Sequence, residues 1–105
     1  MTGDGIYTLG RWVVKAGQEA AFIEAWKDLG AFFLSLPEPP GPGPGTLVQS
    51  TDNPRLFYTL RPWPSAEAVA AMRANPGTPS ESGRLTTLCD EYKPGMFRLI
   101  ATVGG

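Results

Sequence analysis

Three strand-like runs of this chain carry apolar side chains on both of their alternate rows. The first spans Ile6 to Lys15, the second Arg55 to Arg61 and the third Met96 to Val103. In the first run one row holds Ile6, Trp12 and Val14, and the other holds Tyr7, Leu9 and Val13. Successive side chains of a strand point to opposite faces of a sheet, so both faces built by these runs are apolar. Such a sheet has to be covered on two sides.

A helix is expected after the first strand. Apolar residues recur three and four positions apart from Phe22 to Leu36, the spacing of an amphipathic helix, and Glu19 suits the positive end of its dipole. Pro37 ends the pattern, and eight of the nine residues from 37 to 45 are proline or glycine. This composition predicts a loop, either a surface connection or a lid over a cleft.

A hairpin and a helical return complete the pattern. Thr46 to Thr51 and Arg55 to Arg61 flank Asp52-Asn53-Pro54 and predict an antiparallel hairpin. Ser65 is expected to cap a short helix. A second helix is expected to begin at Thr78-Pro79-Ser80-Glu81 with a capping box, and to run to about Tyr92 before Pro94-Gly95. Met96 to Val103 then forms the last strand.

The element order βαββαβ predicts a ferredoxin-like α+β fold, in which a four-stranded antiparallel sheet has its helices on one face. At 105 residues, the whole chain from 1 to 105 is expected to be a single domain. Its helices can cover one face only. A second copy of the same sheet is the simplest cover for the other, which predicts a homodimer through sheet-to-sheet packing.

Composition excludes several classes of function. The nine basic and ten acidic residues nearly cancel and are scattered, so no basic stripe exists for nucleic acid. The run from Met1 to Asp4 lacks the features of a signal peptide, no apolar stretch is long enough for a membrane span, and we expect a cytoplasmic protein. Cys89 is the only cysteine and is expected to be a small buried hydrophobe. With no histidine, the chain lacks histidine-ligated zinc or haem and catalytic triads.

A few landmarks carry a family resemblance. They are Val14-Lys15-Ala16-Gly17, then Glu19, Phe22 and Trp26, then Pro44-Gly45, and finally Trp63, Ser65, Glu67 and Ala68. In this pattern the chain resembles the antibiotic biosynthesis monooxygenase family of dimeric α+β barrel proteins, from about Gly5 to Val103. The resemblance implies a homodimer whose sheets pack face to face.

The resemblance leaves the activity open. Some members of that family oxygenate polycyclic phenols or quinols without metal or flavin, others degrade haem, and many have no known activity. Members often carry a histidine where this chain has Met72, so haem degradation through a histidine ligand is not expected. A cofactor-free oxygenase or a non-catalytic relative remains, and we expect neither a cofactor nor a metal.

Cofactor-free oxygenation sets requirements on residue types. Dioxygen is a triplet and reacts slowly with closed-shell molecules, so the substrate has to be held as an electron-rich anion in a dry aromatic pocket. Candidate substrate-binding residues on the strands are Tyr7, Trp12, Tyr58, Arg61 and Trp63, and Arg11 is a second cation that could pair with the anion. No catalytic residue is assigned. Each of these aromatics could instead be a core or interface residue.

Three functions are therefore compatible with the sequence. The first is oxidation of a small phenol- or quinol-like aromatic by dioxygen. The second is a non-catalytic homodimer that binds a small molecule or serves in a stress response. The third is a structural domain without a ligand, which would have a collapsed interior. Trp26 is expected in the core or lining a pocket between helix and sheet, and Asp90-Glu91 is expected to be a solvated carboxylate pair near a helix end.

Overall fold

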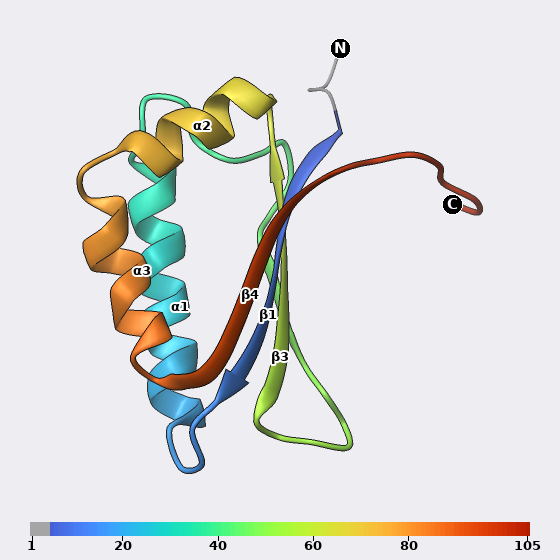
Figure 1. Ribbon diagram of the computed structural model, residues 1–105. Coiled ribbons are helices and arrows are strands. Elements are labelled where there is room, and N and C mark those ends of the chain that lie inside the picture. The colour runs from blue at the N-terminus through green and yellow to red at the C-terminus, as the bar shows by residue number, and fades with distance from the viewer. Residues whose placement is uncertain (1–4) are drawn as a thin grey trace.

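The computed structural model describes residues 5–105 as a four-stranded antiparallel sheet with helices on one face (Figure 1). The elements are β1 (Ile6–Val14), α1 (Glu19–Leu34), β2 (Thr46–Gln49), β3 (Leu56–Trp63), α2 (Ala66–Ala74), α3 (Thr78–Thr86) and β4 (Cys89–Arg98). The strand order is β2-β3-β1-β4. The predicted ferredoxin-like βαββαβ fold is confirmed. The expectation drawn from Met1 to Asp4 lies outside the described residues.

The inner face of the sheet packs against the helices and holds the core. Strand register assigns Trp12 and Val14 of β1, and Phe57 and Trp63 of β3, to this face, and all four are buried. They meet the buried face of α1, on which Phe22, Ala25, Leu29 and Phe33 follow the three-and-four spacing seen in the sequence. One row of β1 and one row of β3 are thereby covered by the chain's own helices.

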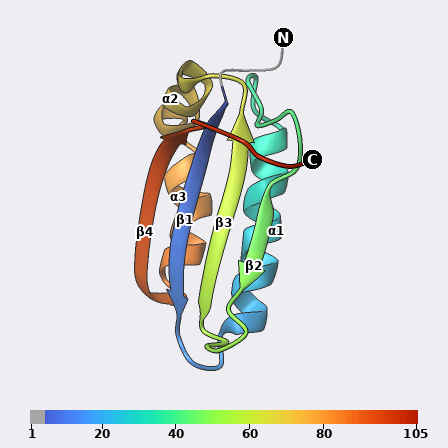
Figure 2. The same ribbon diagram turned by 90° about the vertical axis from the view of Figure 1, so that its right-hand side faces the viewer.

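The outer face of the sheet carries no helix (Figure 2). Antiparallel pairing places Leu9 opposite Leu60 and Tyr7 opposite Phe97, so these side chains share that face. Leu60 is 44% exposed, Tyr58 45% and Phe97 53%. The second row of β1 and β3, which does not face the helices, is thus apolar as predicted. Its side chains are partly open to solvent.

The C-terminal part of the prediction was wrong about where the last helix ends. α3 ends at Thr86, and β4 begins at Cys89 and ends at Arg98, so only the first three residues of the strand expected over Met96 to Val103 lie in it. Asp90 and Glu91 accordingly lie on a strand and not near a helix end. Pro94 lies inside β4 because β4 is an edge strand, where a residue without an N–H group can turn its nitrogen to solvent.

The two helices of the return begin differently from one another. The predicted cap at Ser65 is confirmed, since its Oγ accepts a hydrogen bond of 3.0 Å from the Ala68 N–H. The capping box at Thr78 and Glu81 does not form, and Gly77 is the N-cap residue of α3. The Thr78 hydroxyl donates instead to the Met72 carbonyl at the end of α2, 2.6 Å away. The Met72 carbonyl, which also accepts from the Asn75 N–H, thus links the end of α2 to the start of α3.

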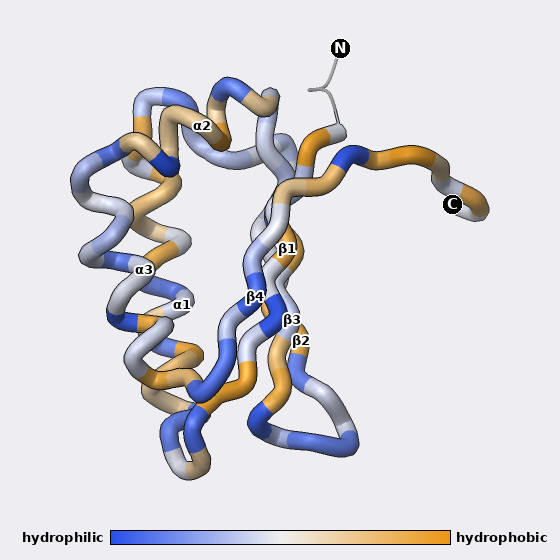
Figure 3. The backbone as a smooth tube through the Cα atoms, in the orientation of Figure 1, coloured by the Kyte–Doolittle hydropathy of each residue, from blue (hydrophilic) through white to orange (hydrophobic). Residues whose placement is uncertain are grey.

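The segment after β4 leaves the sheet on its outer side. From Leu99 onward the chain crosses in front of β1 and β3 in Figure 2, and Figure 3 colours much of it as hydrophobic. Ile100 is 85% exposed and Val103 is fully exposed. Within residues 5–105, no helix combines the length and the apolar character that a membrane crossing requires.

Candidate functional site

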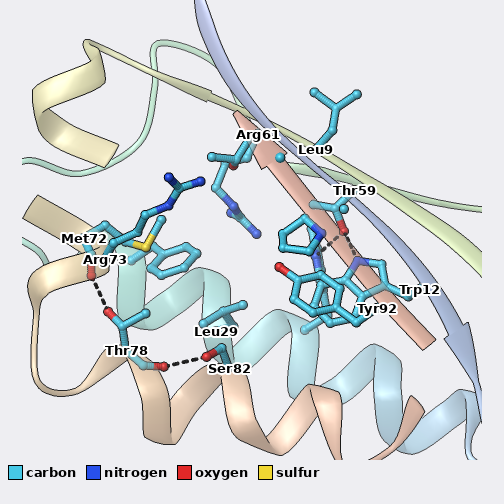
Figure 4. A pocket seen from close by; sticks show the side chains of 16 residues that line it. Leu9, Trp12, Leu29, Thr59, Arg61, Met72, Arg73, Thr78, Ser82 and Tyr92 are labelled. Atoms are coloured by element: carbon cyan, nitrogen blue, oxygen red, sulfur yellow. Dashed lines mark hydrogen bonds between the residues drawn. The ribbon is translucent and has the colours of Figure 1, made fainter. Parts of the chain in front are cut away.

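A cavity of about 290 Å³ lies between the inner face of the sheet and the helices (Figure 4). β1, β3 and β4 form its floor, and Trp26, Leu29 and Phe33 of α1 with Met72 and Arg73 of α2 and Ser82 of α3 line the other side. Its volume is close to the lower end of the range of small-molecule sites, roughly 300 to 1,000 Å³. The cavity suits a ligand of modest size.

Aromatic rings form one wall of the cavity. Trp12 of β1 and Tyr92 of β4 are register partners, and their rings stack 4.0 Å apart at an angle of 18°. Phe22 packs edge-on against Trp12 from behind, at 5.2 Å between centroids. Flat, rigid rings offer a large apolar surface with little conformational freedom to lose, which suits a planar aromatic ligand.

Thr59 joins two of the indoles in this wall. Its Oγ1 accepts a hydrogen bond of 2.9 Å from Trp12 Nε1 and one of 3.1 Å from Trp26 Nε1. The side chain is buried and faces the cavity from the middle of β3. One hydroxyl thereby fixes the orientation of an indole from the sheet and of an indole from α1.

Arg61, two residues further along β3, brings a buried positive charge to the same cavity. It is only 5% exposed, and burial lowers its pKa from 12.5 to about 10, so it stays cationic at neutral pH. The guanidinium carbon lies 5.1 Å from the ring centres of both Trp26 and Phe33. Within residues 5–105 no carboxylate forms an ion pair with it. Aromatic faces, and not an acid, stabilise this cation.

Gly45 makes room for the guanidinium. A Cβ at position 45 would lie 2.5 Å from Arg61 Nη1, closer than real atoms approach, whereas a Cβ at Gly30 would lie 3.7 Å away. Gly45 is the last residue of the proline- and glycine-rich loop, and that loop contributes no residue to the cavity lining. The loop's part in the site is therefore the space that it leaves for Arg61.

Tyr92 and Arg73 bring a phenol and a second positive charge to the cavity. Burial raises the pKa of the Tyr92 phenol, while the charge of Arg73 opposes that rise, so the phenol stays protonated at neutral pH. Figure 4 shows the Tyr92 hydroxyl and the Arg73 side chain on the cavity side. Among residues 5–105, no aspartate or glutamate lines the cavity. The described part of the site has two cations and no carboxylate.

The structure separates the five predicted substrate-binding residues. Trp12 and Arg61 line the cavity. Trp63 is buried beside it, where its Nε1 donates to the hydroxyl of the lining residue Thr8 at 2.9 Å. Tyr7 and Tyr58 lie on the outer face of the sheet, away from the cavity. Their part in ligand binding stays a prediction.

Other candidate residues can also be placed. Arg11 lies on the outer face, paired with Glu91 at 3.3 Å, and is not near the cavity. Trp26 lines the cavity, which is one of the two positions that the sequence predicted for it. Cys89 is only partly buried at the start of β4. Burial and the Asp90 charge raise its pKa to about 11, although the Lys15 charge acts to lower it.

Sequence reasoning did not single out Thr59, Tyr92 or Arg73. A signal existed for Thr59, because it lies on the same alternate row as Arg61 and Trp63. Tyr92 carried no such signal, since it was assigned to a helix. Arg73 gave none either, because an arginine on a short helix is usually a solvated residue. Among residues 5–105, no three His, Cys, Asp or Glu side chains lie close enough together to hold a metal ion.

Neither a family model nor a curated protein matches this chain by sequence. Solved structures do match its fold. SnoaB, a cofactor-independent oxygenase from Streptomyces nogalater, superposes with a TM-score of 0.84 and 22% identity over 98% of this chain and all of that one. A mutant of the same oxygenase gives a TM-score of 0.85 at the same identity and the same coverage of both chains.

A second protein extends the likeness. A Nitrosomonas europaea protein, provisionally identified as an antibiotic biosynthesis monooxygenase, has a TM-score of 0.73 and 18% identity over 91% of this chain and 99% of that one. At these identities the likeness concerns the fold. The chain has the ferredoxin-like fold of SnoaB and of the proteins described as antibiotic biosynthesis monooxygenases.

Proposed function

We propose that this protein is a monooxygenase of the antibiotic biosynthesis type, which oxidises a small phenol- or quinol-like aromatic with dioxygen and without a cofactor. The observation that carries the proposal is the cavity, with its stacked Trp12 and Tyr92 rings and its buried Arg61 cation. The fold shared with the cofactor-independent oxygenase SnoaB supports it.

The chemistry assigned to the cavity is limited to what its residues supply. Oxidation of a phenol to a quinone by one dioxygen inserts one oxygen atom as the new carbonyl and releases the other as water, and the substrate provides all four electrons. The aromatic walls would hold the ring out of water, and the Arg61 guanidinium would stabilise the negative charge of the reactive phenolate. The Tyr92 phenol could donate a proton to a reduced oxygen species.

Oxygen uptake by the purified protein tests this proposal. A panel of quinols and polycyclic phenols would be added in an oxygen electrode after exhaustive dialysis against a chelator. Ser82→Trp places bulk at the cavity lining, and Ser80→Trp places the same bulk on an exposed position of α3. We expect uptake with some member of the panel, lost in Ser82→Trp and kept in Ser80→Trp. Equal uptake by both variants would place the reaction elsewhere.

A non-catalytic binding protein is the second candidate. The observation that favours it is that, within residues 5–105, no carboxylate lines the cavity. The chain also has no histidine, so the described lining holds no obvious general base. Tight binding of a panel member without oxygen uptake would support this alternative. The third interpretation, a domain with a collapsed interior, is disfavoured by the cavity itself.

We further propose that the protein works as a homodimer through the outer face of its sheet. An apolar hollow on that face is lined by Leu9, Leu60, Phe97, Leu99 and Ile100 among others. A second sheet packed on it would cover apolar side chains that the protein's own helices leave in water. In this arrangement Tyr7 and Tyr58 would be interface residues and not ligand contacts.

A further inference from the structure

We propose that the cavity binds its aromatic ligand as an anion, with the ligand's negatively charged oxygen held by Arg61 and by the hydroxyl of Thr59. The inference deepens the proposed function by defining the substrate class, and it rests on the cavity being a ligand site. Its basis is the hydrogen-bonding capacity of the buried polar groups on β3.

Thr59 is restricted to donating. A hydroxyl has one proton to donate and two lone pairs that accept, and an indole N–H only donates. Trp12 and Trp26 occupy both lone pairs, at 2.9 Å and 3.1 Å. The Thr59 hydroxyl donates no hydrogen bond to a group within residues 5–105, and Thr59 is only 8% exposed. Its proton is left for a group inside the cavity.

Arg61 has the same one-sided character. A guanidinium has five N–H donors and no acceptor, and here it is 95% buried without a carboxylate partner among the described residues. Rings of Trp26 and Phe33 cover it but accept no conventional hydrogen bond. Buried charges are ordinarily paired, so an arginine in this condition has room for an anionic partner.

The two groups stand next to each other on the inner row of β3 and meet the same cavity. Arg73 adds a second positive charge to the lining, and no acidic side chain from residues 5–105 lies in that lining to oppose it. An oxygen that only accepts hydrogen bonds and carries negative charge satisfies both groups at once. Because no carboxylate of the described residues lines the cavity, the ligand is expected to arrive already ionised, its anion being favoured by the surrounding positive charge.

Equilibrium binding with matched aromatic probes tests the proposal without requiring turnover. 2-Naphthoate carries the negative charge as a carboxylate, and 2-hydroxy-1,4-naphthoquinone carries it as a ring enolate at neutral pH. Their neutral counterparts of similar shape are 2-naphthamide and 2-methoxy-1,4-naphthoquinone. We expect quenching of tryptophan fluorescence to show at least one anion binding about tenfold or more tightly than its neutral counterpart, as a charged hydrogen bond warrants.

Variants test whether Arg61 causes the preference for the anionic probe. Arg61→Met is expected to reduce the ratio of the two dissociation constants to near one while the neutral probe binds as before. Gly45→Ala keeps the charge but displaces the guanidinium, and should weaken the preference, whereas Gly30→Ala, whose Cβ meets Arg61 at 3.7 Å, should keep it. Thr59→Ser should also keep it.

Two results would overturn the inference. One is equal binding of both anions and their neutral counterparts by the unmodified protein, and the other is no saturable binding of either anion at millimolar concentration. Neither measurement needs a variant to fold. Anion preference without oxygen uptake would leave this inference standing and reject the proposed oxygenase, so the two failures are distinguishable.

Discussion

At the scale of single residues, Thr59 carries more of the site than its size suggests. Its one hydroxyl oxygen accepts from two indole N–H groups that come from different layers of the molecule, β1 and α1. A buried N–H without an acceptor costs about 1 to 3 kcal/mol. The orientation of both indoles, and with it the shape of the cavity, therefore depends on this oxygen.

Thr59→Val should lower the free energy of unfolding by about 2 to 4 kcal/mol, because it leaves the buried Trp12 N–H and the partly buried Trp26 N–H without an acceptor while keeping the side-chain volume. Thr59→Ser keeps the oxygen and should cost about 1 kcal/mol for the lost methyl group. Urea denaturation followed by circular dichroism measures both. Similar losses in the two variants would show that the hydroxyl does not hold the indoles.

Cys89 illustrates how burial sets reactivity. Its pKa is raised from 9.0 to about 11, so at pH 8 the folded protein holds about a hundredfold less thiolate than an ordinary cysteine would. The raised pKa means that Cys89 loses its proton at a higher pH in the folded protein than in the unfolded chain.

Iodoacetamide should therefore alkylate Cys89 slowly in the folded protein at pH 8, and the rate should climb with pH up to about 11. In urea the same thiol should react at the rate of a free cysteine. Mass spectrometry of timed samples gives both rates. A rate in the folded protein that levels off near pH 9 would contradict the assignment.

At the scale of elements, α2 depends on its first residue. The Ser65 side chain accepts from the Ala68 N–H at 3.0 Å, and α2 carries Met72 and Arg73 to the cavity. A cap of this kind stabilises a helix by about 1 kcal/mol.

Ser65→Ala should thus lower the free energy of unfolding by about 1 kcal/mol, measured by thermal or urea denaturation. The matched control is Ser80→Ala, an exposed serine inside α3, which should change stability by less than about 0.5 kcal/mol. Equal losses of stability in the two variants would show that the Ser65 cap does not stabilise α2.

The elements also show what could be predicted from the sequence. Three-and-four spacing predicted α1, and apolar runs bounded by turn-forming residues predicted β1 and the hairpin. The prediction failed between Leu85 and Tyr92, where Pro94-Gly95 was taken as a helix end. This segment is a strand because Tyr92 of β4 pairs with Trp12 of β1. A pairing between residues 80 positions apart leaves no signal in the local sequence.

The site was predictable to the same degree. Trp12 and Arg61 could be chosen by residue type, but the sequence did not reveal which alternate row faces the helices. Tyr7 and Tyr58 were therefore included although they lie on the other face. The row is set by the packing of β1 and β3 against α1, with Phe22 and Phe33 filling the space above Trp12 and Trp63.

At the scale of the whole molecule, the two faces of the sheet have separate tasks in this account. The inner face, with α1, α2 and α3, forms the core and the cavity, and the outer face is the proposed contact with a second copy. The C-terminal segment from Leu99 leaves on the outer side, with Ile100 and Val103 in solvent, and it would contribute to the same contact.

Leu60→Lys should convert a dimer into a monomer, because it would bury a charge between two apolar sheets. Leu34→Lys changes an exposed leucine of α1, 69% exposed and off the sheet, and should leave the dimer intact. Sedimentation velocity at micromolar concentration distinguishes the species. A monomeric unmodified protein would reject the dimer.

The most direct test of the account is a crystal structure of the protein with 2-naphthoate or 2-hydroxy-1,4-naphthoquinone bound. We expect the aromatic rings of the ligand against Trp12, Trp26 and Tyr92, and its charged oxygen about 3 Å from the Arg61 guanidinium. A ligand bound on the outer face of the sheet, or bound in the cavity with its charged oxygen turned away from Arg61, would contradict the account.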